Sequence, residues 1–184
     1  MNSYYNIIDL SIIHYSNSCE FYIPHEIRKI IKEYTYKEIN DKNIHSAVKL
    51  WYHNKEKAII LYGHISYWDT SKVTDMSNLF MFLNNFNDKI DNWDVSQVTN
   101  MQFMFYNASL FNQPIGNWNV SKVNNMSRMF NYASSFNQPI GDWNVTNVIY
   151  MRGMFYNASS FNQPIGNWNI SQITNMESNV FQCY

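Results

Sequence analysis

Cysteine and charge are both scarce in this chain. Two cysteines, Cys19 and Cys183, lie at opposite ends of the 184 residues, which is too few for a disulfide scaffold and too far apart for a CxxC metal motif. Charged residues make up only 15% of the chain and leave a net charge of −1, so no basic surface for nucleic acid is indicated. We therefore expect reduced, intracellular thiols and no nucleic-acid partner.

A long hydrophobic run is missing as well. The N-terminal stretch has no basic segment, and Asp9 and His14 interrupt its apolar residues, so it is typical of neither a signal peptide nor a membrane span. Aromatic residues reach 17%, which is too many for a disordered tail. These features predict a cytoplasmic protein with no signal peptide and no membrane partner.

What the chain does have is a strict internal repeat. From about residue 64 to the C-terminus, several residue types recur every 25 residues without insertions. The recurring columns are Trp68, Trp93, Trp118, Trp143 and Trp168; Met76, Met101, Met126 and Met151; and Phe86, Phe111, Phe136 and Phe161. Such a period is typical of repeat proteins, whose units bury their apolar sides by stacking on one another. Like residues are therefore predicted to lie over like residues and to form structural ladders.

Each unit is predicted to contain one short helix and one short parallel strand. In residues 126–133, Met, Met, Phe and Ala fall at i, i+3, i+4 and i+7, which is the spacing of one helical face. Asp75, Asn100 and Asn125 stand just before this face in successive units, where a side-chain oxygen can accept from free N–H groups. A proline after the Phe-Asn-Gln segment should end any strand there. The predicted fold class is an α/β repeat solenoid of five coils over residues 64–184.

Asparagine is unusually frequent, at 28 of 184 residues, and concentrates in the repeats. Asn87, Asn112, Asn137 and Asn162 are predicted to form an internal amide ladder that bonds backbone groups of neighbouring coils. The column that begins at Asp69 holds Asp or Asn in every coil, with Ser or Thr two positions later, which is the pattern of an Asx turn. We prefer this turn to a calcium site, because calcium takes about six to eight oxygen ligands.

The unit Phe-Asn-Gln-Pro-Ile-Gly-Asn-Trp-Asn-Val-Ser-x-Val-x-Asn-Met-x-x-Met-Phe resembles the repeat of the BspA-like leucine-rich-repeat family, over about residues 64–184. This family occurs in bacterial surface lipoproteins, in protists and in giant DNA viruses. The resemblance implies a leucine-rich-repeat-like solenoid used for binding or adhesion, and it carries over no catalytic residue. Bacterial members usually have a lipoprotein signal, whereas Cys19 does not follow an apolar leader. An intracellular location is therefore expected, in the host cell if the source is a virus.

Residues 1–63 are predicted to form a small, mainly helical cap on the first coil, because an unprotected end would expose the apolar ladders to water. The predicted elements are a hairpin over residues 4–23 and helices over about 25–35, 44–53 and 55–62, the last of which ends at Gly63. Residues 23–31, Ile-Pro-His-Glu-Ile-Arg-Lys-Ile-Ile, resemble the start of an F-box, the helical module that docks on a ubiquitin-ligase linker.

No catalytic or metal-binding constellation is recognisable. The five histidines lie within residues 14–64 and lack the HExxH spacing, and no nucleophile elbow accompanies the serines. We therefore predict no enzymatic activity, no cofactor and no metal. Six N-x-S/T sequons are interpreted as by-products of an Asn- and Ser-rich repeat.

Functional residues are sought in columns that stacking does not dictate. Aromatic and Arg side chains, which are enriched at protein interfaces, occupy such positions on the outer face of the predicted helices. These partner-binding candidates are Phe103, Tyr106, Arg128, Tyr132, Arg152 and Tyr156. The alternative interpretation is a tolerant, solvated surface.

The sequence thus predicts a non-catalytic scaffold that presents a repeat surface to a partner protein. One alternative is a ubiquitin-ligase substrate adaptor that docks through its F-box-like segment, and another is a secreted or surface adhesin. In the last coil, Asn179 and Cys183 replace the Met and Ala expected from the repeat, which predicts a polar end. The other possibility is an apolar end face that pairs with a second copy, so a monomer or an end-to-end homodimer is expected.

Overall fold

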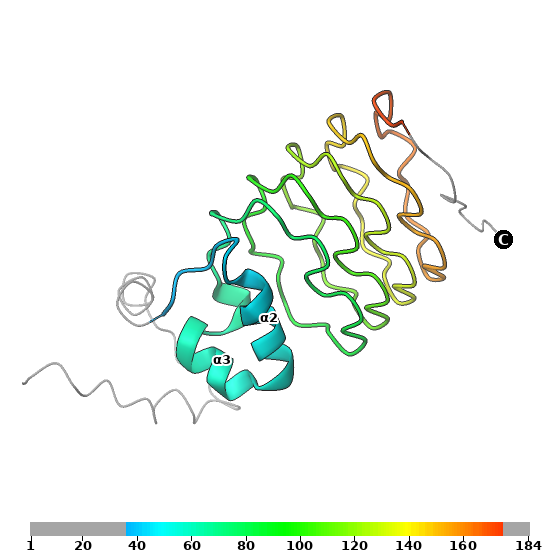
Figure 1. Ribbon diagram of the computed structural model, residues 1–184. Helices are drawn as coiled ribbons and strands as arrows, with labels where there is room; N and C mark the ends of the chain where they lie inside the picture. The colour runs from blue at the N-terminus through cyan, green and yellow to red at the C-terminus, as the bar shows by residue number, and fades with distance from the viewer. Residues whose placement is uncertain (1–35, 175–184) are drawn as a thin grey trace, which may run out of the picture. The chain divides into compact units, whose positions relative to one another are not determined.

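The computed structural model describes residues 36–174, which lie in one compact unit. This unit begins with the helices α2 (Ile44–His53) and α3 (Lys55–Tyr62) and the short 3-10 helix η2 (Ile65–Tyr67), and continues as a series of similar coils (Figure 1). The hairpin predicted over residues 4–23 and the helix predicted over about 25–35 lie outside the described residues. The predicted division of the chain at residues 63 and 64 stays a prediction.

The two helices form where the sequence has matching local signals. The buried residues of α2 are Ile44, Ala47, Val48 and Trp51, which share one helical face. The Asn54 side chain accepts a hydrogen bond from the N–H of Lys57 at the start of α3, and Gly63 ends that helix with a φ of 74° and an N–H bond to Ile59. The Trp51 ring meets the first repeat tryptophan, Trp68, edge to face at 6.3 Å.

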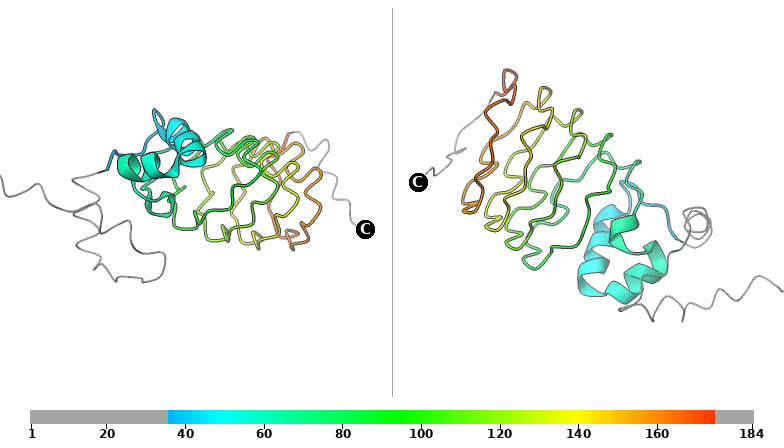
Figure 2. Two further views of the ribbon diagram at one scale, coloured as in Figure 1. Left: turned by 90° about the horizontal axis from the view of Figure 1, so that it is seen from below. Right: turned by 180° about the vertical axis from the view of Figure 1, so that it is seen from behind.

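The α/β repeat solenoid predicted from the sequence is wrong. Within the described part of the chain, residues 68–174 contain no α-helix and no strand. Isolated parallel bridges join one coil to the next, and they pair Asp75 with Asn100, Asn100 with Asn125, and Asn125 with Tyr150. In the four units where the structure describes it, the segment predicted as a helix is instead a run of overlapping turns. The coils nevertheless stack in sequence order, as Figure 2 shows from two further sides.

Left-handed residues prevent the predicted helix from forming. Arg128 and Tyr132 have φ values of 56° and 59°, a region that a right-handed helix excludes. The N–H groups of Met129 and Ala133 therefore donate to carbonyls three residues earlier, at 3.2 and 3.0 Å, rather than four residues earlier. Such turns still place the apolar residues on one side, so the spacing predicted the burial correctly although it predicted the wrong conformation. Met126, Met129, Phe130 and Ala133 are all fully buried.

The N–H groups that a helix would use internally bond to the next coil. Arg128, Phe130 and Tyr132 donate to the carbonyls of residues 152, 154 and 156, each at 2.9 Å. The same alternation recurs in the two preceding coils, for example from Phe105 to Met129 at 2.9 Å. A helix of about eight residues is unstable by itself, because few bonds repay its nucleation. In stacked coils, every second N–H donates to a carbonyl of the next coil, and the N–H groups between them donate to acceptors within their own turns.

Aromatic rings stack along the coils at the spacing that these hydrogen bonds set. Phe105 and Phe130 lie 5.5 Å apart with planes 4° from parallel, and Trp143 and Trp168 lie 6.5 Å apart at 4°. Each repeat tryptophan also bonds backward, since the indole N–H of Trp118 donates to the carbonyl of Ile90 in the preceding coil at 3.3 Å. The predicted tryptophan, methionine and phenylalanine columns lie in the core, where Met76, Met101 and Met126 are 0% exposed and Met151 4%, except that Phe161 is only partly buried and packs against the core.

The predicted asparagine ladder is present, but it lies at the surface. The Asn87 side-chain oxygen accepts from the N–H of Asn112 at 2.9 Å and from the amide nitrogen of Gln113 at 3.0 Å, and the two following coils repeat both bonds. Its end members Asn87 and Asn162 are exposed and its middle members Asn112 and Asn137 are half-buried, so the ladder lies at the edge of the coils and not deep in the core. The Asx turns of the Asp69 column are confirmed, beginning with the bond from the Ser71 N–H to Asp69 at 3.1 Å.

The first coil has no preceding coil to accept its hydrogen bonds, and the side chain of Asp41 accepts them instead. Thr99 donates its N–H to the carbonyl of Thr74, whereas Thr74 itself donates to the carboxylate of Asp41 at 2.8 Å. The Thr74 hydroxyl and the Asp75 N–H donate to the same carboxylate at 2.7 and 3.1 Å. Burial raises the pKa of Asp41, but the bonds from Thr74 and Asp75 outweigh burial and hold that pKa below its usual value.

A substitution at Gly141 tests how closely neighbouring coils approach each other. A Cβ at Gly141 would overlap with the carbonyl oxygen of Pro164 in the next coil, whereas a Cβ at Gly166 would meet nothing within 4 Å. We expect Gly141→Ala to lower the free energy of unfolding by about 1–3 kcal/mol, as overpacking does, and Gly166→Ala to change it by less than about 0.5 kcal/mol. Urea melts of both variants measure the difference, and equal effects would contradict the predicted stacking.

Asp41 should make stability depend on pH. Because its pKa is lower in the folded than in the unfolded chain, the carboxylate stabilises the fold above about pH 4, and this contribution disappears as the pH falls through the folded pKa. Asp41→Asn should therefore lower the urea midpoint at about pH 7 and have less effect at the lowest pH where both proteins stay folded. A midpoint difference that does not change with pH would contradict the assigned role of the charge.

Candidate functional site

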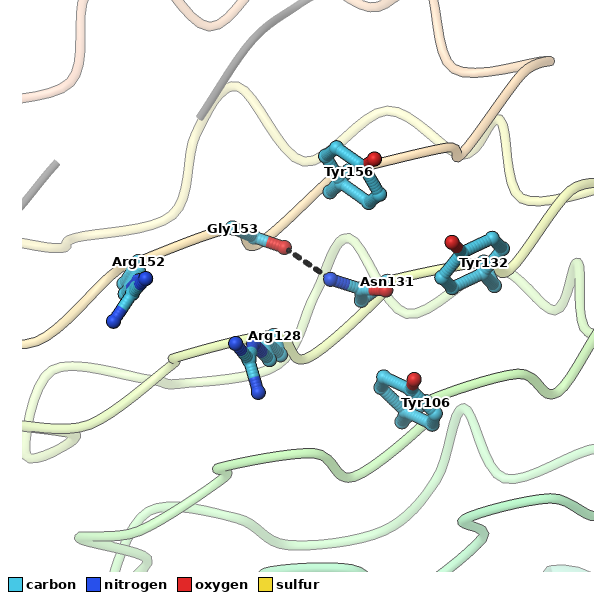
Figure 3. A pocket seen from close by; sticks show the side chains of 7 residues that line it. All are labelled: Tyr106, Arg128, Asn131, Tyr132, Arg152, Gly153 and Tyr156. Atoms are coloured by element: carbon cyan, nitrogen blue, oxygen red, sulfur yellow. Dashed lines mark hydrogen bonds between the residues drawn. The ribbon is translucent and has the colours of Figure 1, made fainter. Parts of the chain in front are cut away.

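The six partner-binding residues predicted from the sequence come together around two adjoining hollows. The larger hollow has a volume of about 270 Å³ and the smaller one about 180 Å³. The larger one is lined by Tyr106, Arg128, Asn131, Tyr132, Arg152, Gly153 and Tyr156 (Figure 3). The smaller one is lined by Gln102, Phe103, Ser127, Arg128 and Arg152. Because Arg128 and Arg152 line both, the hollows form one continuous surface, which we call the tyrosine–arginine face. That this face binds a partner stays a prediction.

The backbone that carries this face is left-handed at positions occupied by bulky residues. Phe103, Arg128 and Tyr132 have φ values of 57°, 56° and 59°. Asparagine and glycine adopt this region most readily, and they occupy the same columns elsewhere, at Asn78, Asn107, Gly153 and Asn157. The bulky residues therefore add backbone strain of about 1–2 kcal/mol each, which is typical of functional positions.

Four aromatic side chains form a strip that crosses four coils. Phe82, Tyr106, Tyr132 and Tyr156 meet one another edge to face, with ring centroids 5.3, 6.1 and 5.7 Å apart. We call them the aromatic strip. Phe82 is 54% exposed, Tyr132 42% and Tyr156 39%, so a large apolar area faces solvent. Aromatic pairs of this geometry hold each other in place, which gives the strip a fixed shape.

The cationic part of the face lies beside the strip. The guanidinium of Arg128 lies over the ring of Phe103, 5.5 Å from its centroid, in a cation–π contact. Within residues 36–174, the linings of the two hollows include two arginines and no aspartate or glutamate. Arg128 therefore brings a positive charge to the face, although the whole chain carries a net charge of −1.

Asn131 forms the centre of the larger hollow and was missed by the sequence analysis. It is 5% exposed, and its amide nitrogen donates to the carbonyl of Gly153 at 3.2 Å. Its amide oxygen is buried and has no hydrogen-bond partner. A signal was present in the sequence, because Asn131 interrupts a column that has Tyr106 and Tyr156 25 residues away on either side.

Other kinds of site receive no support from the described residues. Residues 36–174 hold no group of three or more His, Cys, Asp or Glu side chains placed to bind a metal ion. In the same range, no helix combines the length and hydrophobicity needed to cross a lipid bilayer. The F-box-like residues 23–31, and Asn179 and Cys183 in the last coil, lie outside the part that the structure describes.

Comparison with known proteins identifies the family of the repeats. The family model described as "Mycoplasma protein of unknown function, DUF285" matches residues 46–149 and residues 81–184. This match supports the resemblance to BspA-like repeats and does not include the F-box-like segment. No curated protein and no solved structure matches the chain. Because the matches together cover residues 46–184, well over half of the sequence, the chain belongs to the family of Mycoplasma proteins of unknown function, DUF285.

Proposed function

We propose that this protein is a non-catalytic scaffold that binds a partner protein through the tyrosine–arginine face. The observation that carries this proposal is the placement of Phe103, Arg128 and Tyr132 at left-handed positions, where asparagine or glycine would cost less. Nothing in the stacking of the coils requires these side chains, because the core is filled by their neighbours, such as the buried Met104 and Met129. A binding role explains why they occupy strained positions.

The composition and the rigidity of the face support protein recognition. Tyrosine and arginine are, with tryptophan, the residue types enriched among side chains that dominate binding energy at protein interfaces. Tyr132 and its neighbours are held by ring contacts, and the backbone beneath them bonds to the adjoining coils, as from Tyr132 to Tyr156 at 2.9 Å. A surface that is ordered before binding loses little entropy when a partner docks.

A matched pair of triple variants tests the proposal. The first variant replaces Tyr106, Tyr132 and Tyr156 with alanine, and the second replaces Tyr52, Tyr67 and Tyr150, tyrosines of similar exposure that do not line the hollows. Both proteins and the wild type are used to capture cross-linked partners from cells that express the chain, after circular dichroism shows that each is folded. We expect the first variant to reduce recovery of the main partner at least about tenfold and the second to leave it unchanged. Equal recovery by the two variants would refute a binding role for this face.

A further inference from the structure

We propose that the segment recognised by the tyrosine–arginine face is an acidic peptide in extended conformation. In this complex a carboxylate pairs with the guanidinium of Arg128, and a backbone N–H of the peptide donates to the amide oxygen of Asn131. This inference rests on the proposed function, because it names the chemistry of the partner that the same face binds.

The position of Arg128 favours a carboxylate. Its guanidinium is held over the Phe103 ring and lines both hollows, so it reaches a ligand in either one. A planar guanidinium pairs with a carboxylate through two parallel hydrogen bonds, and stacking on a ring leaves its edge available for these bonds. Among the residues that the structure describes, the linings contain no acidic side chain. A ligand carboxylate therefore complements the charge of the face.

The amide oxygen of Asn131 has no hydrogen-bond donor among the residues that the structure describes. Figure 3 shows the Asn131 carboxamide in the middle of the larger hollow, with its nitrogen toward Gly153 and its oxygen on the side of the tyrosine rings. This oxygen has no partner although the side chain is 5% exposed, and such a group costs free energy until a donor reaches it. An extended peptide carries backbone N–H groups at regular intervals, and one of them can donate to this buried oxygen once the neighbouring side chains shift on binding, while a peptide side chain reaches Arg128.

The arrangement of the rings favours a peptide over a sugar or a nucleic-acid base. Sugars and bases bind aromatic side chains through open ring faces. In the aromatic strip, Tyr106 meets Tyr132 at 69° and Tyr132 meets Tyr156 at 75°, so each contact covers part of a ring face with a neighbouring edge. Apolar and backbone atoms of a peptide can pack against such a corrugated surface.

Fluorescence anisotropy with defined peptides tests the inference on the full chain. The probes are labelled peptides of about twelve residues in which serine alternates with glutamate or with the neutral isostere glutamine. We expect the glutamate peptide to bind at least about tenfold more tightly than the glutamine peptide and to lose affinity as salt is added.

Three variants assign the roles of the residues. Arg128→Gln should weaken binding of the glutamate peptide about tenfold and remove the preference over glutamine. Lys122→Gln is the matched control, because it removes a positive charge from the same coil at a residue that lines neither hollow, and it should leave binding unchanged. Asn131→Leu should weaken both peptides alike, because it removes the acceptor for the backbone N–H but not the cation.

The outcomes separate this inference from the proposed function. Equal binding of the two peptides, or an equal effect of Arg128→Gln and Lys122→Gln, would overturn the acidic-peptide inference. An oligogalacturonate that binds with Arg128 dependence while the glutamate peptide does not would overturn it in favour of an acidic sugar. In each case, loss of partner capture in the Tyr106, Tyr132 and Tyr156 variant would still uphold the proposed function, and only equal capture by the matched triple variants would refute both.

Discussion

In the first three coils, every second backbone N–H of one short segment donates to a carbonyl oxygen of the following coil, as Phe105 does to Met129. This hydrogen bonding requires that successive coils have the same length, and the repeat of 25 residues indeed runs without insertion. It also places like side chains of adjacent coils directly over one another, separated by the spacing between one coil and the next. The ring columns, the indole bonds to preceding coils and the surface asparagine ladder all follow from this register.

The sequence predicted the register and the buried columns, because side-chain type and spacing directly report which positions stack. It did not predict the conformation. A helix and a run of turns, in which each N–H bonds to the carbonyl three residues earlier, both place residues i, i+3, i+4 and i+7 on one side. Two columns of the repeat did distinguish turns from a helix, because they contain asparagine or glycine, which favour left-handed backbone. One column contains Asn78 and Gly153, and the other contains Asn107 and Asn157.

The candidate site could be predicted in part for the same reason. Its six side chains were identified because stacking does not dictate their columns, and the structure places all of them around adjoining hollows. Asn131 was missed because its burial arises from neighbouring coils, which a single repeat does not reveal. The strain at Phe103, Arg128 and Tyr132 is sustained by hydrogen bonds to the next coil, so the ladder that builds the fold also holds the face in shape.

The most direct test of this account is an NMR measurement of couplings across hydrogen bonds in a chain labelled with ¹⁵N and ¹³C. The account predicts correlations from the amide nitrogen of Phe105 to the carbonyl carbon of Met129, and from that of Phe130 to that of Met154. Correlations from Phe105 to Met101 and from Phe130 to Met126 would instead show a helix within each unit, and they would contradict the stacking on which the tyrosine–arginine face depends.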